Sequence, residues 1–290
     1  MRSRFPPAPP WSIMKSLLRP SSLAFAALIL TAGLPVRAQA PAPLGSTVCD
    51  WDALVPQPTP VGMIRRLFDG PAETLERLEM HVTTLNPGHD SHPPHHHPQE
   101  ELILIKEGTV EFSINGRQEK VGAGSLVFAA SHDRHNLSNF SDRPATYYVI
   151  NFYTAATATV RDQAASTWAP AGLLRSGVID WAKLAPAPTD TGVRRQLIDS
   201  PTLTFARLEI HATTLDAHRL ATAASRHPWP ALLIVKEGVI AADIGGVSHL
   251  VGPGAIIYLA PNTWHSIGNP GAVPSTYYVF FVSSAATPPS

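Results

Sequence analysis

The second half of the chain repeats the first without a gap, and this repeat limits the fold more than any other feature. Four segments recur at a constant offset of 130 residues, so that Gly108 corresponds to Gly238. A unit of about 105 residues is long enough to form a domain. The recurring pairs are DWDALVPQP with DWAKLAPAP, RLEMHVTTL with RLEIHATTL, LILIKEG with LLIVKEG, and TYYV with TYYV, which start at residues 50, 77, 102 and 146 in the first half.

Each unit has the pattern of short β-strands. Leu78, Met80 and Val82 alternate with polar neighbours, which is the period of two that a strand requires. Asn115-Gly116 between two such runs predicts a hairpin turn. Six or more short strands separated by turns, with no long amphipathic helix, indicate a sandwich or barrel. We therefore predict an all-β protein with two lobes.

The repeat also divides the chain. We place the N-terminal domain at 48–153, a linker at 154–177 and the C-terminal domain at 178–283. The linker is rich in alanine and threonine, and a short helix is expected near Ala164.

The first forty residues have the features of a secretory signal peptide. Residues 23–34 are an apolar run that is too short to span a bilayer, and Lys15 and Arg19 precede it. Ala38-Gln39-Ala40 fits the small-residue cleavage pattern, so we expect cleavage after Ala40. The mature protein is then exported, to the periplasm or the extracellular space, and keeps no membrane anchor. The alternative is that the apolar run stays uncleaved and anchors the protein in the membrane.

Charge and cysteine content exclude several classes. The net charge is zero and charged residues make up only 15%, so the chain lacks the basic surface of a nucleic-acid-binding protein. Cys49 is the single cysteine and cannot form an internal disulfide, so the fold depends on its core. A small-molecule substrate is the expected partner, and a homo-oligomer is compatible with the sequence.

SHPPHHHPQEE, residues 91–101, contains the clearest candidate site. His95, His97 and Glu101 share parity, so an extended chain points all three to one face. His135 follows a later turn and can reach the same point from a neighbouring strand. Three imidazoles and one carboxylate form a mixed nitrogen and oxygen site for a divalent first-row metal. Glu100 is an alternative to Glu101 as the carboxylate ligand. In an extended chain, however, Glu100 would point to the face opposite to that of His97, so we favour Glu101.

This segment resembles the cupin superfamily, whose first motif is G-x5-H-x-H-x3,4-E-x6-G. His95, His97, Glu101 and Gly108 match its core, although six residues rather than five follow Gly88. The second motif, G-x5-P-x-G-x2-H-x3-N, is matched by Gly124, His135 and Asn139, with Ala130 and His132 in place of proline and glycine. The resemblance implies two tandem cupin barrels of the jelly-roll (double-stranded β-helix) type, a bicupin with germin-like domains.

The second half serves as an internal control. His227 and His265 correspond to His97 and His135, but Ser225 replaces His95 and Ala231 replaces Glu101. Two imidazoles make a weak site, so we expect one metal ion per chain, in the N-terminal half. The alternative is a second ion, zinc or copper, bound by His227 and His265. Tyr147, Arg77, Glu79 and His81 recur in the second half and are interpreted as architectural. His96 and His132 are expected to point away into solvent.

Two interpretations of function stay open. The first is a metal-dependent enzyme, either an oxidoreductase such as a dioxygenase or a lyase or hydrolase, acting on a small anionic or phenolic substrate. The cofactor is expected to be one divalent transition metal: manganese, iron, zinc, copper or nickel. The resemblance favours manganese or iron, whereas metal uptake outside the cytoplasm favours copper or zinc, so the identity of the metal stays open. The second is a non-catalytic module that binds a small molecule or a sugar. No residue can be assigned a catalytic role from the sequence.

Overall fold

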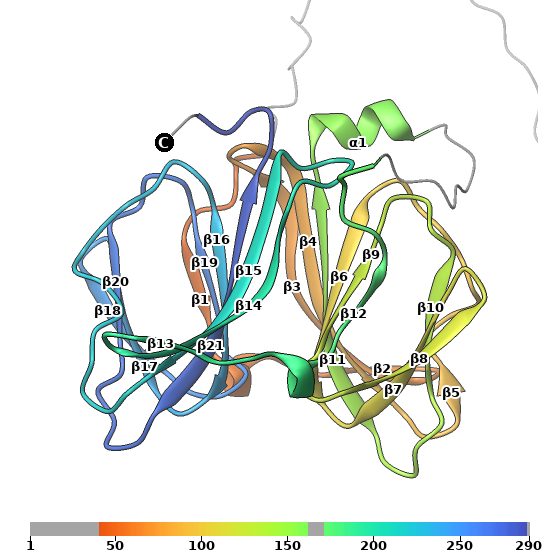
Figure 1. Ribbon diagram of the computed structural model, residues 1–290, viewed down its shortest axis with the longest axis horizontal. Coiled ribbons are helices and arrows are strands. Elements are labelled where there is room, and N and C mark those ends of the chain that lie inside the picture. Colours follow the sequence, from red (N-terminus) through yellow and green to blue (C-terminus); the bar gives the residue numbers. More distant parts are fainter. Residues whose placement is uncertain (1–40, 162–170, 289–290) are drawn as a thin grey trace, which may run out of the picture. The chain divides into compact units, whose positions relative to one another are not determined.

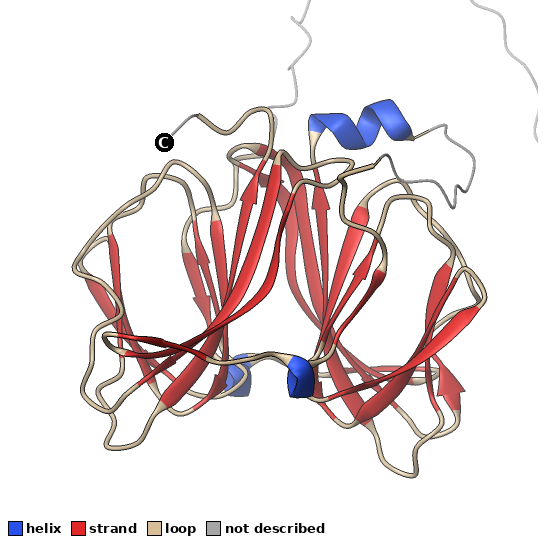
Figure 2. Ribbon diagram, in the orientation of Figure 1, coloured by secondary structure: helices blue, strands red, loops and turns tan. Residues whose placement is uncertain are grey.

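A computed structural model describes residues 41–161 and 171–288 of the chain. The signal peptide expected at residues 1–40 and the helix expected near Ala164 lie outside the described residues. Residues from Pro41 onward cluster as one compact unit. This unit is built almost entirely from strands, as Figure 2 shows, which confirms the all-β prediction.

The N-terminal barrel consists of a seven-stranded and a four-stranded sheet. The strand orders are β12-β9-β6-β11-β4-β3-β2 and β5-β10-β7-β8. Its strands are β2 (Gln57–Thr59), β3 (Gly62–Ala72), β4 (Leu75–Leu85), β5 (His89–Asp90), β6 (Glu100–Glu107), β7 (Thr109–Ile114), β8 (Arg117–Gly122), β9 (Leu126–Ala129), β10 (His135–Asn139), β11 (Ala145–Tyr153) and β12 (Gly177–Ile179). Asn115 and Gly116 both have positive φ between β7 and β8, as the predicted hairpin turn requires.

The C-terminal barrel repeats this plan with a seven-stranded and a three-stranded sheet. The orders are β1-β19-β16-β21-β15-β14-β13 and β18-β17-β20. Its strands are β1 (Thr47–Cys49), β13 (Ala187–Thr189), β14 (Gly192–Ser200), β15 (Arg207–Leu215), β16 (Ala231–Glu237), β17 (Ile240–Ile244), β18 (Val247–Val251), β19 (Ile256–Leu259), β20 (His265–Gly268) and β21 (Ser275–Ser283).

The two barrels exchange their first strands. β1 precedes the N-terminal barrel in sequence but pairs with β19 of the C-terminal barrel. β12 precedes the C-terminal barrel but pairs with β9 of the N-terminal barrel. Figure 1 shows the orange β1 among the blue strands, and the green β12 beside β9. The edge of each large sheet is therefore completed by the other half of the chain.

The two large sheets pack against each other, and side-chain parity separates the resulting cores. In β6, Leu102 and Leu104 belong to a core that both repeats share, whereas Ile103 and Ile105 belong to the core inside the N-terminal barrel. Burial on both faces explains why LILIK is apolar throughout instead of alternating.

Two buried tyrosines connect the barrels in a symmetric way. The hydroxyl of Tyr148 donates to the carbonyl of Gly254 at 3.1 Å, and that of Tyr278 donates to the carbonyl of Gly124 at 2.9 Å. Trp181 packs against Gly124 and Tyr278 at one of these points. Trp51, which follows β1, packs in the same way against Gly254 and Tyr148. The residues that follow the exchanged strands therefore contact the same tyrosine–glycine hydrogen bonds.

Helices contribute little to the described structure. α1 (Ala155–Val160) lies in the linker, and two single 3-10 turns, Trp51–Ala53 and Trp181–Lys183, follow the exchanged strands. None of the helices within residues 41–161 and 171–288 is long and apolar enough to cross a membrane.

Gly124 provides a test of the contact between the barrels. Its φ is +89°, and a Cβ added there would lie 2.9 Å from Cγ of Trp181. We expect Gly124→Ala to lower the free energy of unfolding by about 2 kcal/mol or more, because it combines backbone strain with a clash. Gly122→Ala is the matched control, since its Cβ would meet nothing within 4 Å. Chemical denaturation measures both variants, and equal losses would contradict this role.

Candidate metal centre

The segment before β6 and the first residue of β10 form the backbone of the site. His95 and His135 are paired in an isolated antiparallel bridge. The amide of His95 donates to the carbonyl of His135 at 3.1 Å, and the amide of His135 donates to that of His95 at 2.8 Å. The distant turn thus brings His135 to the histidine-rich segment, as predicted from the sequence.

Four side chains meet at this bridge. His95, His97 and His135 each offer a ring nitrogen, and these nitrogens lie within 4.8 Å of one another. The carboxylate of Glu101 lies 3.4 Å from Nε2 of His135 and 3.7 Å from Nε2 of His97. The structure therefore brings together all four residues that the sequence nominated. That they bind a metal stays a prediction.

Backbone carbonyls set the tautomers of two imidazoles. Nδ1 of His97 lies 2.9 Å from the carbonyl of Gln99, and Nδ1 of His135 lies 2.8 Å from that of Asp133. A carbonyl can only accept, so each Nδ1 carries the proton and each Nε2 presents a lone pair. This arrangement is the usual support for a metal-bound histidine.

The site contains buried nitrogens that lack a hydrogen-bond partner. They are Nε2 of His97, Nε2 of His135 and Nδ1 of His95. The contacts of Glu101 with the first two are too long to count as good hydrogen bonds. Unpaired buried acceptors are costly, and a cation placed among them would remove that cost. The residues present therefore fit a divalent metal.

The electrostatics act differently on the members of the cluster. Burial lowers the pKa of His135, but its contact with Glu101 outweighs burial and raises that pKa above its ordinary value. Burial lowers the pKa of His95 to about 4, and the neighbouring imidazoles add to this shift. Burial by itself raises the pKa of Glu101, but the contacts with His135 and His97 outweigh it and hold that pKa below its ordinary value. Glu101 is consequently a buried anion that requires a positive partner.

Glu100 faces the opposite way, toward the C-terminal barrel. Its carboxylate is buried and accepts hydrogen bonds from the hydroxyl of Thr202 at 2.5 Å, the hydroxyl of Thr204 at 2.7 Å and the amide of Leu203 at 3.0 Å. Burial raises the pKa of Glu100, although these bonds oppose the shift. The sequence parity separated the two glutamates, but it did not reveal that Glu100 joins the barrels.

The surplus histidines have different surroundings. The exposed His92 packs edge-on against His95, with ring centroids 4.0 Å apart. His96 is exposed and contacts His132, not the cluster, so the prediction for His96 is confirmed. The expectation that His132 is exposed is wrong. Its Nε2 donates to the carbonyl of Val160 at 2.6 Å, and α1 thereby buries the ring.

Asn151 is a residue of this site that the sequence argument missed. It lies opposite Glu101 in the β6–β11 ladder, and its Oδ1 is buried without a partner. Its Nδ2 donates to Glu79 at 2.8 Å, and Glu79 contacts Nδ1 of His81 at 2.7 Å. The sequence contained one indication of its role. Phe281 occupies the corresponding position in the second repeat, which lacks the full ligand set.

A cavity of about 760 Å³ lies next to the cluster, and we call it the N-terminal vestibule. His81, His92 and Tyr147 contribute to its wall. Because His92 also packs on His95, the vestibule is where a small molecule would approach the cluster.

The C-terminal repeat keeps the backbone of the site but not its ligands. Ser225 and His265 form the same isolated bridge as His95 and His135. His227 and His265 remain close, with ring centroids 5.0 Å apart. Within the described residues, the cluster of His95, His97 and His135 is the one group of three or more potential ligands at metal-site distances.

Comparison with known proteins agrees with this architecture. Residues 81–151 and 212–281 each match the family model of the cupin domain. The chain therefore belongs to the cupin superfamily and contains two cupin domains, as the motif resemblance implied.

Solved structures share the fold over most of the chain at low identity. The protein Ylba from E. coli aligns with a TM-score of 0.61 at 9% identity, over 82% of this chain and 90% of its own. Bacillus subtilis oxalate decarboxylase aligns with a TM-score of 0.60 at 12% identity, over 84% and 79%. AerE from Microcystis aeruginosa gives 0.59 at 12%, over 79% and 97%. These similarities show the fold.

One curated relative matches a short stretch. The HTH-type transcriptional activator RhaS of Klebsiella pneumoniae is 40% identical over 43 residues. The match covers 15% of this chain and 16% of the activator.

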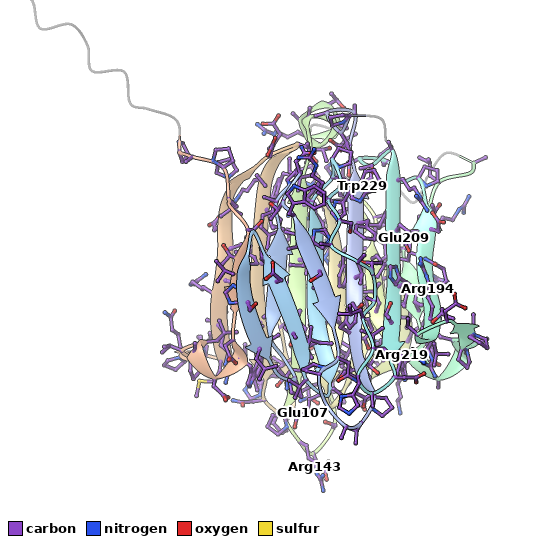
Figure 3. All side chains as sticks on the ribbon, turned by 90° about the vertical axis from the view of Figure 1, so that its left-hand side faces the viewer. Glu107, Arg143, Arg194, Glu209, Arg219 and Trp229 are labelled. Carbon is purple, nitrogen blue, oxygen red and sulfur yellow. The ribbon has the colours of Figure 1, made fainter. Side chains whose placement is uncertain are left out.

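Glu100 provides the second test. We expect Glu100→Ala to lower the free energy of unfolding by about 2–3 kcal/mol, because it leaves buried donors of Thr202, Leu203 and Thr204 unpaired. Glu100→Gln, which can still accept hydrogen bonds, should lose less. Glu107→Ala is the control, since Glu107 ends the same strand with an exposed side chain, near the lower end of the molecule in Figure 3. Equal stability of the two alanine variants would exclude the contact as a stabilising one.

Proposed function

We propose that this protein is an exported metal-dependent enzyme that acts through the N-terminal cluster on a small anionic or phenolic molecule. One observation carries the proposal. Three imidazole nitrogens without partners and an ionised carboxylate converge beside a vestibule, whereas the corresponding place in the other barrel has lost two of the four groups.

His95, His97, His135 and Glu101 would hold the ion. Three neutral ligands and one anionic ligand leave a divalent centre with a net charge near +1, which favours carboxylate, enolate or phenolate oxygens as further ligands. When bound, the metal supplies Lewis-acid catalysis or, if it is redox-active, binding of dioxygen. Manganese has support among the structural neighbours, since one report on the Bacillus subtilis oxalate decarboxylase concerns its Mn(II) centres. Iron, zinc, copper and nickel are the other candidates.

The chain's own groups around the cluster would orient the substrate. Asn151, which lies opposite Glu101 on the neighbouring strand, donates to Glu79, and Glu79 contacts His81. His81 lines the vestibule, so this series of contacts extends from the cluster to the vestibule wall. His92 lines the same wall and packs on His95. Polar groups on one side of the vestibule and the apolar wall of Val61, Ile64 and Leu137 suit a small molecule with a single polar end.

The third prediction concerns His135. We expect purified protein to contain about one metal ion per chain, and His135→Ala to lose both the ion and turnover, because the lone pair of Nε2 is removed. His96→Ala is the matched control, since this imidazole lies between two ligands in sequence but points away. Elemental analysis measures the metal, and an assay of oxygen uptake and carbon dioxide release measures turnover on small aromatic and dicarboxylic acids.

Different outcomes separate enzyme from binding module. Turnover that disappears with the ion supports the enzyme. Tight binding of a small molecule that a chelator leaves unchanged, with no turnover of any acid, would support the non-catalytic alternative. Two tightly held ions per chain would contradict the assignment of the site to one barrel.

Export is the fourth prediction. Residues 1–40 lie outside the described structure, and the proposal of export rests on their sequence. We expect the protein recovered from the periplasm or the medium to begin at Pro41. Met14, directly before Lys15, is an alternative start of translation. N-terminal sequencing tests cleavage, and an exported chain that still begins at Met1 or Met14 would disprove it.

A further inference from the structure

The C-terminal barrel contains a cavity of about 360 Å³ that corresponds to the N-terminal vestibule. Nine of its residues lie 130 positions after residues that line the vestibule, among them Arg194, His211 and Tyr277. The two cavities are therefore the same feature of the repeated fold.

The C-terminal cavity extends further into its barrel. Its wall also includes Ser225, His227, Ala231, His265 and Phe281. These positions correspond to the four metal-ligand candidates and Asn151, and none of those five residues lines the vestibule. A serine in place of histidine and an alanine in place of glutamate remove the side-chain atoms that would fill this level. The place of the metal centre has become open space.

Two hydrogen-bond acceptors face this space. Nδ1 of His227 lies 2.5 Å from the carbonyl of Trp229, and Nδ1 of His265 lies 2.9 Å from that of Thr263. Each Nδ1 therefore carries the proton, and each Nε2 presents a lone pair. Nε2 of His227 is buried without a partner. Trp229 stacks on His227 at an interplanar angle of 6° and holds the ring in place.

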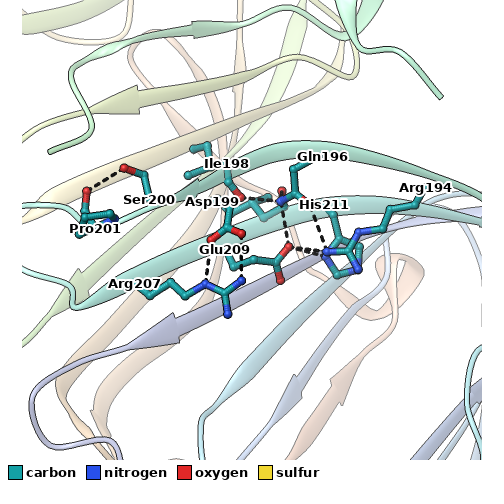
Figure 4. A network of polar contacts seen from close by, with 10 residues as sticks. Arg194, Gln196, Ile198, Asp199, Ser200, Pro201, Arg207, Glu209 and His211 are labelled. Atoms are coloured by element: carbon teal, nitrogen blue, oxygen red, sulfur yellow. Dashed lines mark hydrogen bonds and ion pairs between the residues drawn. The ribbon is translucent and has the colours of Figure 1, made fainter. Parts of the chain in front are cut away.

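The rest of the cavity wall is apolar beside the two imidazoles, and its one cationic side chain is paired with a carboxylate. Leu233, Val279 and Phe281 line the cavity beside the two imidazoles. Arg194 is the one cation in the wall, but its guanidinium donates to Glu209 at 2.8 Å, as Figure 4 shows. Figure 3 shows the two residues next to each other along one edge. Gln196 and His211 also bond to Glu209.

We propose that the C-terminal barrel is a second, metal-free binding site for a small neutral phenol or similar aromatic alcohol. The hydroxyl hydrogen is donated to Nε2 of His227 or His265, and the ring lies against Leu233, Val279 and Phe281. An anion is disfavoured because the imidazoles present lone pairs and Glu209 neutralises Arg194. The inference uses only residues of the C-terminal barrel and does not depend on the function proposed for the N-terminal one.

Calorimetry with resorcinol tests this site, since resorcinol has two hydroxyl donors on a planar ring. We expect one molecule to bind per chain in His135→Ala, which removes the N-terminal metal centre and with it any binding of resorcinol to that metal. The dimethyl ether of resorcinol has the same ring without a donor and should bind about tenfold more weakly or not at all. Absence of resorcinol binding at millimolar concentration would overturn the proposal, as would equal binding of the ether.

Two variants locate the site. Ala231→Leu fills the cavity with an apolar side chain, so it should abolish the resorcinol binding that His135→Ala retains. Introduced alone into the natural protein, it should leave one metal ion per chain. The double variant Ser225→His, Ala231→Glu rebuilds the four-ligand set, so it should hold two ions and lose resorcinol binding. Circular dichroism checks that both variants are folded. Unchanged resorcinol binding in Ala231→Leu, or a second ion in the natural protein, would overturn the assignment.

Discussion

The two large sheets pack against each other, and this packing determines the environment of each side chain in their strands. A strand between two apolar cores has no solvent face, so its even and odd positions differ only in which core they enter. In β6 the even positions reach the core that both repeats share, and the odd positions reach the interior of one barrel. One further residue along the strand changes the environment completely.

The adjacent carboxylates of Glu100 and Glu101 show this division at the site. Glu101 enters the barrel and meets imidazoles, whereas Glu100 enters the shared face and meets the hydroxyls and amide of residues 202–204. Each carboxyl group is buried, but Glu101 lies among imidazoles that can share a cation with it, whereas Glu100 is held by neutral donors. The strand that carries a candidate metal ligand is thus anchored by its neighbour to the opposite domain.

Most of the fold and the four clustered residues could be predicted, because both depend on periodicity and on an exact repeat. Parity placed His95, His97 and Glu101 on one face, and the turn before β10 brought His135 to them. Contacts between repeats could not be predicted in this way. The exchange of β1 and β12, the role of Glu100 and the burial of His132 under α1 all depend on tertiary packing. Asn151 was missed because a single difference between repeats is weak evidence without a structure.

Strand exchange has a consequence for the order in which the protein acquires its structure. β1 is synthesised first, yet its partner β19 comes near the end of the chain, and the neighbouring Ser46 bonds to a residue 217 positions later. The N-terminal barrel, in turn, lacks its edge strand until β12 emerges. Pairings this distant make closure slow, and neither barrel reaches its final form as a separate intermediate. The two repeats therefore share a scaffold in which each barrel is completed by a strand from the other half, although the residues that line their two cavities differ.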